Sequence, residues 1–331
     1  MTFAEWHSLV APGAARLFSL GRHALAAAFR AAGIGTLDRV LLPEFICRDV
    51  LASLHEVGAI PVWYPIGEGL RPSSPPQDWP QARAVLAVNY FGFPQALDPF
   101  LVYAQRTGAL VIEDNAHGLF SRDAEGRWLG TRTNAGVFSL RKTLPLADGA
   151  MLVVNPRLAE ALGAPLAEAG QGFTPSVKLK ARIKRFPIIG AAVSAAITYL
   201  VRMLRRMLTG HAIAPSDAFD EVAMPYPPAP HIGLAADFAA VDIDAEIERR
   251  RGLYRTAETV ARSAGVKPLL SDLPRMISPY GFAFRASVDE APLQRWAASK
   301  GLEIINWPAL PDAIERQAPE FYRNVRLVNF L

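Results

Sequence analysis

Short apolar runs recur along the first 155 residues and are separated by longer stretches of helical character. The runs are bounded by turn-forming residues, as buried strands usually are. They predict strands at residues 39–42, 60–64, 84–89, 110–112, 137–139 and 150–154. The stretches between them predict helices at residues 23–32, 49–57 and 99–107, each followed by a glycine that ends the helix. Proline-rich residues 72–80 predict a surface loop, and residues 123–127 a hairpin tip.

Short apolar strands that alternate with helices are typical of a mainly parallel sheet covered on both faces. In such sheets, ligands bind at the carboxyl ends of the strands. Asn89, Asp114 and Lys142 each follow a predicted strand. We therefore expect these three side chains to converge at one edge of the sheet.

The second half of the chain has a different pattern. Residues 225–230 (PYPPAP) predict a linker, and helical spacing of apolar residues resumes from residue 237. Residues 268–331 alternate short strands with a helix at 291–300. We therefore expect a large α/β domain over residues 1–224, and over 225–331 a linker, a helix and a small α+β domain.

Residues 173–209 combine a basic stretch, KLKARIKR, with a run of uncharged residues and a second basic stretch, RMLRRML. The uncharged run is shorter than the ~20 apolar residues that a membrane-spanning helix needs. Three interpretations remain open. The segment is a buried or oligomer-interface helix pair, a basic amphipathic element (178–209) on an anionic membrane surface, or a transmembrane span.

Composition narrows the class of protein. With 331 residues, 51% hydrophobic and 20% charged, the chain can bury a large core. A net charge of +4 is too small to indicate nucleic-acid binding. The single cysteine, Cys47, excludes an intrachain disulfide and a cysteine-based zinc site, so no metal is expected and a reducing cytoplasm fits. The N-terminus carries Glu5 and no basic region, so we do not expect a signal peptide.

Two predicted strand ends carry chemically informative residues. The strand at 110–112 is followed by Glu113 and Asp114, and the strand at 137–139 by Lys142, the only lysine before residue 178. Pyridoxal 5'-phosphate chemistry requires a lysine that forms a Schiff base with the cofactor aldehyde. It also requires a carboxylate that keeps the pyridine nitrogen protonated, so that the ring acts as an electron sink. The pattern therefore indicates an enzyme that uses this cofactor.

With these elements in place, the chain resembles the DegT/StrS-type sugar aminotransferases, which belong to the fold type I pyridoxal phosphate superfamily. The resemblance runs in order from about residue 18 to 155. It rests on the segments FSLGRHALAAAFRAAGIGTLDRVLLPEF, GAIPVWYPI, VNYFGFPQALDP, VIEDNAHG and FSLRKTLPLADGA. The fold that it implies is a large cofactor-binding α/β domain followed by a small C-terminal α+β domain.

The resemblance also implies roles by position. Asp114 would pair with the pyridine nitrogen, His117 would lie near the ring hydroxyl, and Lys142 would form the Schiff base and then shuttle the proton. Backbone N–H groups at a helix start favour a dianion. The cofactor phosphate would accordingly be held by Ser19, Gly21, Arg22 and Ser139, and Asn89 would lie at the same edge of the sheet.

The chain departs from the family pattern at several positions. Lys142 follows Ser139 by three positions, where the family usually has five. The family often stacks an aromatic side chain on the ring at the position of Cys47, and Phe45 is the nearest aromatic residue here. The family also supplies an Asn/Arg motif from a partner subunit, and His231 is a weak substitute for it.

Two functions follow. The first is an aminotransferase acting on a ketosugar, nucleotide-linked, with glutamate or glutamine as amino donor and a homodimer in the cytoplasm. The second is a catalytically diverged binding or scaffold protein in polysaccharide or lipid-linked sugar biosynthesis, peripheral at the inner membrane surface through residues 178–209. A sugar dehydratase is a related alternative, but in that branch histidine replaces the lysine, and Lys142 argues against it. No nucleic-acid partner is expected.

Overall fold

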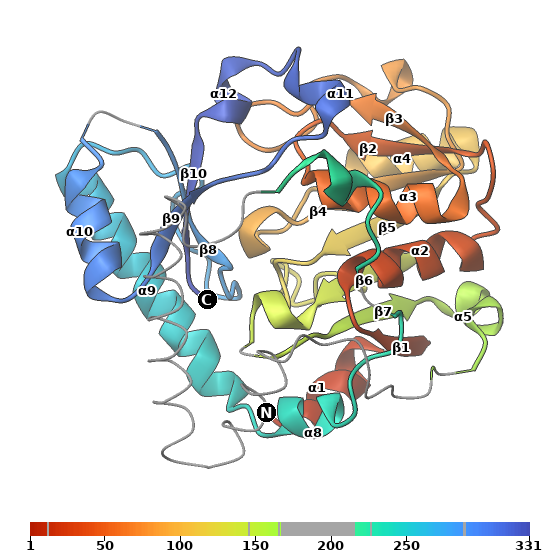
Figure 1. Ribbon diagram of the computed structural model, residues 1–331, viewed down its shortest axis with the longest axis horizontal. Helices are drawn as coiled ribbons and strands as arrows, with labels where there is room; N and C mark the ends of the chain where they lie inside the picture. Colours follow the sequence, from red (N-terminus) through yellow and green to blue (C-terminus); the bar gives the residue numbers. More distant parts are fainter. Residues whose placement is uncertain (12, 145, 165, 167–215, 226, 287–288) are drawn as a thin grey trace.

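A seven-stranded sheet lies within the larger part of the computed structural model (Figure 1). The structure describes residues 1–11, 13–144, 146–164, 166, 216–225, 227–286 and 289–331. The strands follow the order β1-β7-β6-β5-β4-β2-β3. Their bounds are β1 Ala14–Phe18, β2 Arg39–Pro43, β3 Ile60–Tyr64, β4 Ala84–Val88, β5 Leu110–Asn115, β6 Ala135–Ser139 and β7 Ala150–Val154. Strands β2 to β6 run parallel, whereas β7 is antiparallel to β6 and β1 to β7. The predicted mainly parallel sheet is confirmed.

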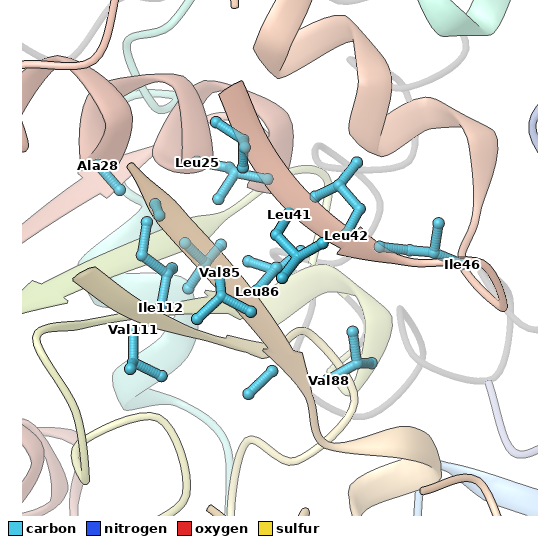
Figure 2. Packing of buried hydrophobic residues seen from close by; sticks show 14 of the residues in the cluster. Leu25, Ala28, Leu41, Leu42, Ile46, Val85, Leu86, Val88, Val111 and Ile112 are labelled. Carbon is cyan, nitrogen blue, oxygen red and sulfur yellow. The ribbon is translucent and has the colours of Figure 1, made fainter. Parts of the chain in front are cut away.

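Alternate residues of the strands point to opposite sides of this sheet. Because the residues on both sides are apolar, helices cover both faces. In β7, Ala150 and Leu152 enter the core beneath helix α2 (Gly21–Ala31), whereas Met151 and Val153 enter a second core. Helices α1 (Phe3–Val10) and α8 (Leu234–Ala239) cover that second core. The first core, part of which is shown in Figure 2, joins Leu25 and Ala28 of α2 to the apolar side chains of β2, β4 and β5.

The remaining helices of the sheet region are α3 (Leu51–Val57), α4 (Asp98–Thr107) and α5 (Pro156–Leu162). Helices α3 and α4 lie close to the predicted ranges, whereas α5 was not predicted; Gly58 and Gly108 end α3 and α4 in the left-handed conformation. The prediction of a helix from residue 49 is wrong at its start, because residues Arg48–Val50 form a 3₁₀ turn before α3.

A small antiparallel sheet lies in the C-terminal part of the chain, with the order β8-β10-β9. Its strands are β8 Gly281–Arg285, β9 Glu303–Asn306 and β10 Val325–Asn329, and helices α9 (Ile243–Ser263) and α10 (Ala291–Ser299) pack against it. Two short helices, α11 (Asp312–Glu315) and α12 (Glu320–Arg323), precede β10. The helix predicted from residue 237 is interrupted: α9 begins anew at Ile243, because the Asp242 side chain accepts a hydrogen bond from the Ala245 N–H and caps it.

Residues 173–209 lie outside the described residues, and so do the interpretations of 178–209 as an interface, membrane-surface or spanning element. Within the described part of the chain, no helix is both long enough and apolar enough to cross a membrane.

Strand β5 is longer than predicted and includes both acidic residues of the Glu-Asp pair. Glu113 and Asp114 pair with Ala87 and Val88 of β4, and Asn115 pairs with Phe138 of β6. Successive residues of a strand point to opposite faces. The two carboxylates therefore have different surroundings, although they are neighbours in the sequence.

Gly136 in β6 permits a close backbone approach by the loop before it. A Cβ atom at this position would lie 1.8 Å from the Gly130 carbonyl oxygen. We expect Gly136→Ala to lower the free energy of unfolding by about 3 kcal/mol or more, the upper end of the cost of overpacking, because backbone cannot move aside as a side chain can. The midpoint of urea denaturation measures this change.

Gly252→Ala in α9 is the matched control, because no heavy atom lies within 4 Å of the added Cβ. In a helix interior this substitution is expected to stabilise the protein by up to about 1 kcal/mol. Equal urea midpoints for Gly136→Ala and the wild type would contradict the predicted clash.

Candidate active site

A cavity lies at the carboxyl ends of β4, β5 and β6, beside the start of helix α2. Seven of the residues predicted for the site line it: Gly21, Arg22, Cys47, Asp114, His117, Ser139 and Lys142. The other lining residues are Leu20, Leu25, Ile46, Asp49, Val50, Ser53, Val88, Ala116, Val137, Arg141 and Trp307. The expected convergence of Asp114 and Lys142 at one edge of the sheet is therefore present.

Asp114 reaches the cavity from the end of β5. Its Oδ1 atom accepts a hydrogen bond of 3.0 Å from the Ala116 N–H. Burial raises the pKa of the carboxyl group, and the nearby Lys142 amine offsets part of that rise. A cationic partner bound in the cavity would therefore stabilise the ionised carboxylate.

Lys142 ends a 3₁₀ turn, Leu140–Lys142, that directly follows β6. Burial disfavours the charged form of the Lys142 amine. The neighbouring acidic groups, Cys47, Asp49, Tyr280 and Asp114, outweigh burial and raise the pKa of the amine. Of these groups, the Cys47 thiol stays neutral near pH 7, because burial raises its pKa to about 12. The carboxylates whose negative charge favours the protonated amine at neutral pH are therefore Asp49 and Asp114.

His117 is part of an aromatic stack. Its ring lies parallel to that of Tyr280, with centroids 4.2 Å apart, and edge-on to Trp307 at 5.4 Å. The Phe91 N–H donates to His117 Nδ1 at 3.4 Å, so Nε2 carries the proton of the neutral ring. Burial lowers the pKa of His117 well below its usual value, which keeps the ring neutral at physiological pH.

The start of α2 offers unused hydrogen-bond donors to the cavity. No side chain caps the helix, and the N–H groups of Gly21 and Arg22 make no hydrogen bond to the described part of the chain. The Ser139 hydroxyl, across the cavity, likewise has no partner among the described residues. Donors at a helix N-terminus next to a hydroxyl suit a phosphate dianion.

Glu113, the neighbour of Asp114, belongs to a buried network instead of the cavity. Its carboxylate accepts from Arg132 Nη2 at 2.7 Å and Nε at 2.9 Å, and from the Gly130 N–H at 3.0 Å. The side chains of Glu113 and Arg132 are 0% and 3% exposed. This ion pair fixes the loop between β5 and β6, so Glu113 has a structural role.

The sequence provides an independent comparison. Residues 13–172 match the sequence model of the DegT/DnrJ/EryC1/StrS aminotransferase family. Over these residues, which are just under half of the chain, the sequence is similar to this family. The match includes Asp114, Ser139 and Lys142, together with the start of α2.

Solved structures of similar fold cover almost the whole chain. S. venezuelae DesV, in complex with a ketimine intermediate, has a TM-score of 0.65 and 21% identity over 98% of this chain and 82% of its own. Helicobacter pylori PseC, an aminotransferase in pseudoaminic acid biosynthesis, has a TM-score of 0.66 and 14% identity over 98% and 84%. E. coli GDP-4-keto-6-deoxy-D-mannose-3-dehydratase, with bound hydrated PLP, has 0.63 and 15% over 98% and 85%. All three are less than 25% identical to the chain, and the likeness shows that the chain shares their fold.

Three residues that the family resemblance suggested do not line the cavity. The Ser19 hydroxyl donates to the Pro227 carbonyl, and Phe45 packs against Trp307 at 5.2 Å between ring centroids. The Asn89 amide nitrogen donates to Glu113 Oε2 at 3.1 Å. The three are buried and already have partners within the chain, so they support the cavity walls from behind.

His231 is also engaged within its own chain. Its ring contacts Asp148 through Nδ1 and Asp237 through Nε2, the latter at 3.0 Å. Burial disfavours the imidazolium, but Asp148 outweighs it and raises the pKa of His231. The structure therefore gives His231 intrachain partners in place of the family's motif from a second subunit.

The structure adds two side chains that sequence reasoning missed. Asp49 forms an ion pair of 3.2 Å with Arg22 at the cavity, and Trp307 closes the cavity from the C-terminal part of the chain. The signal for Asp49 was its place in the first turn of a predicted helix, where an acidic residue is ordinary. Trp307 lies far along the chain in a segment without a motif, so no local pattern could assign it.

Proposed function

We propose that the protein is a pyridoxal phosphate-dependent aminotransferase that acts on a nucleotide-linked ketosugar, with glutamate or glutamine as amino donor. One observation carries the proposal. Lys142, Asp114 and several hydrogen-bond donors that suit a phosphate line one cavity at the carboxyl ends of the strands. These donors, the Ser139 hydroxyl and the N–H groups of Gly21 and Arg22, make no hydrogen bond to the described residues. The family match supports the reaction class, and the printed names of similar structures support the cofactor and a sugar substrate.

The residues present fit this cofactor. The Ser139 hydroxyl and the N–H groups of Gly21 and Arg22 would hold its phosphate, and Asp114 would hold its pyridine nitrogen. When bound, the cofactor supplies an electron sink that stabilises negative charge on the carbon attached to the transferred amino group.

Lys142 has two tasks in this scheme. Its Nζ atom would hold the cofactor covalently through the aldehyde. When free of that bond, the Nζ atom near Asp49 and Asp114 could take a proton from the donor carbon and later return it. Both tasks need a single amine at the cavity, and Lys142 is the only lysine among the lining residues that the structure describes.

The aromatic residues keep water away from this amine. Trp307 and His117 both line the cavity, and the His117 ring stacks in parallel on that of Tyr280. Because these rings are buried, they lower the local dielectric and strengthen the interaction between Asp114 and a protonated ring nitrogen.

The active form in this proposal is a cytoplasmic homodimer. Exposed apolar side chains support it: Phe219 and Ile232, which are 71% and 66% exposed, flank the segment whose Ala223 carbonyl accepts from Arg22 at the cavity. Exposed large apolar side chains near an active site are candidates for a subunit interface.

The experiment is a titration of the purified protein with pyridoxal phosphate. A visible absorbance band should appear, and borohydride reduction should leave a cofactor adduct on the peptide that contains Lys142. Adding L-glutamate or L-glutamine should then bleach the band, and a ketosugar acceptor should restore it. A protein that shows neither band nor adduct at saturating cofactor would refute the proposal.

A further inference from the structure

Among the described residues, the lining of the cavity contains three side chains that are cationic at neutral pH: Arg22, Arg141 and Lys142. The carboxylates of the lining are Asp49 and Asp114. The assignment of the cations decides which of them can hold an incoming anion. The inference below rests on the proposed function.

Two of the three cations already have a partner or a role in the proposed chemistry. Arg22 pairs with Asp49 through Nη2 at 3.2 Å and donates to the Ala223 carbonyl through Nη1. Lys142 is reserved for the covalent bond to the cofactor. Neither side chain is therefore free to neutralise a phosphate.

The third cation of the cavity lining is Arg141. Its guanidinium makes no hydrogen bond or ion pair within the part of the chain that the structure describes, and its Nε atom is buried without a partner. A buried donor without a partner costs free energy, and the cost is larger for a charged group. A ligand in the cavity that accepts from this guanidinium would remove the cost.

The backbone holds Arg141 beside the start of α2. The Gly149 carbonyl accepts from the Arg141 N–H at 3.3 Å, and the Gly149 N–H donates to the Ser19 carbonyl at 2.8 Å. Ser19 immediately precedes the N-cap of α2. The turn that carries Arg141 is thus tied to the helix start whose N–H groups face the same cavity.

We propose that Arg141 binds the phosphate group of the cofactor, together with Ser139 and the start of α2. In pyridoxal phosphate, the phosphate arm and the aldehyde are on adjacent ring carbons. Two consecutive residues, Arg141 and Lys142, therefore serve two adjacent groups of one ligand. Arginine suits this role because its planar guanidinium can donate two parallel hydrogen bonds to phosphate oxygens.

The test compares pyridoxal phosphate with pyridoxal, which lacks the phosphate, by titrating the apoprotein and measuring each Kd from visible absorbance. Arg141→Gln is expected to raise the Kd for pyridoxal phosphate by roughly 10- to 100-fold, the loss of a hydrogen bond to a charged group. The Kd for pyridoxal should stay unchanged. Arg141→Lys, which keeps the charge without the paired donors, should give an intermediate loss for pyridoxal phosphate only.

Arg157→Gln on the exposed surface of α5 is the matched control and should change neither Kd. Equal losses for both ligands in Arg141→Gln would overturn the inference, because the residue would then act through the fold. Unchanged affinity for both would overturn it as well and would assign Arg141 to a different anion. Failure of the wild-type protein to bind pyridoxal phosphate would instead refute the proposed function itself.

Discussion

Replacing Lys142 by alanine is expected to lower the transamination rate by about 10⁴-fold, the upper range for loss of a general acid–base group. The borohydride-stable adduct should disappear completely. No other lysine lines the cavity among the described residues, so no second amine can take over either task. The overall fold should persist, because the Lys142 side chain makes no hydrogen bond or ion pair that the described structure records.

Two variants separate the chemistry of Lys142 from its charge. Lys142→Arg keeps a cation near Asp49 and Asp114 but cannot form the covalent bond, so it should be as inactive as alanine. Lys300→Ala, on the exposed end of α10, should retain wild-type activity and the adduct. Rates come from a coupled assay of 2-oxoglutarate formation. Wild-type turnover by Lys142→Ala would remove Lys142 from the mechanism.

Replacing Asp114 by asparagine is expected to reduce the rate by about 10²- to 10³-fold, comparable to the loss of one electrostatic stabiliser of a transition state. Asparagine has the size of aspartate but no charge, so it cannot keep the pyridine nitrogen protonated. The covalent adduct on Lys142 should still form, because the aldehyde does not depend on that nitrogen. The substitution should therefore lower the transamination rate without preventing formation of the adduct.

A cofactor analogue provides the control for Asp114. When the ring nitrogen is methylated, the ring carries a permanent positive charge and no longer needs a carboxylate to hold its proton. Reconstitution of Asp114→Asn with this analogue is expected to recover part of the lost rate, measured in the same coupled assay. Equal deficits with both cofactors would show that Asp114 acts on something other than the ring nitrogen.

The sequence predicted six of the seven strands of the large sheet and much of the cavity, but it missed β1, which lies at the edge of the sheet beside β7. Each short apolar run predicted a strand, because a buried parallel strand needs apolar side chains on both faces. The positions of Asp114 and Lys142 followed from the rule that ligands bind at the carboxyl ends of strands. The shortened spacing between Ser139 and Lys142 is accommodated by a 3₁₀ turn, and both residues line the cavity.

The predictions that were wrong or missing concern residues whose positions depend on contacts between distant segments. The end of β5 was placed too early, because charged residues in a strand are tolerated only when neighbours such as Arg132 neutralise them. Asn89 was expected at the site but supports Glu113 from behind. Trp307 became part of the cavity through tertiary packing, which leaves no local trace in the chain.

The cavity joins residues made early in protein synthesis to residues made late. Leu20 and Lys142 line one side and Trp307 another, and Arg48, beside the cavity residue Cys47, is held by Asp312 and Glu315 of α11 at 2.9 and 3.1 Å. At ordinary elongation rates, a ribosome adds Trp307 roughly ten to thirty seconds after Lys142. During that interval the lysine is present on the nascent chain without the wall that encloses it. We therefore expect cofactor binding to follow the synthesis of Trp307.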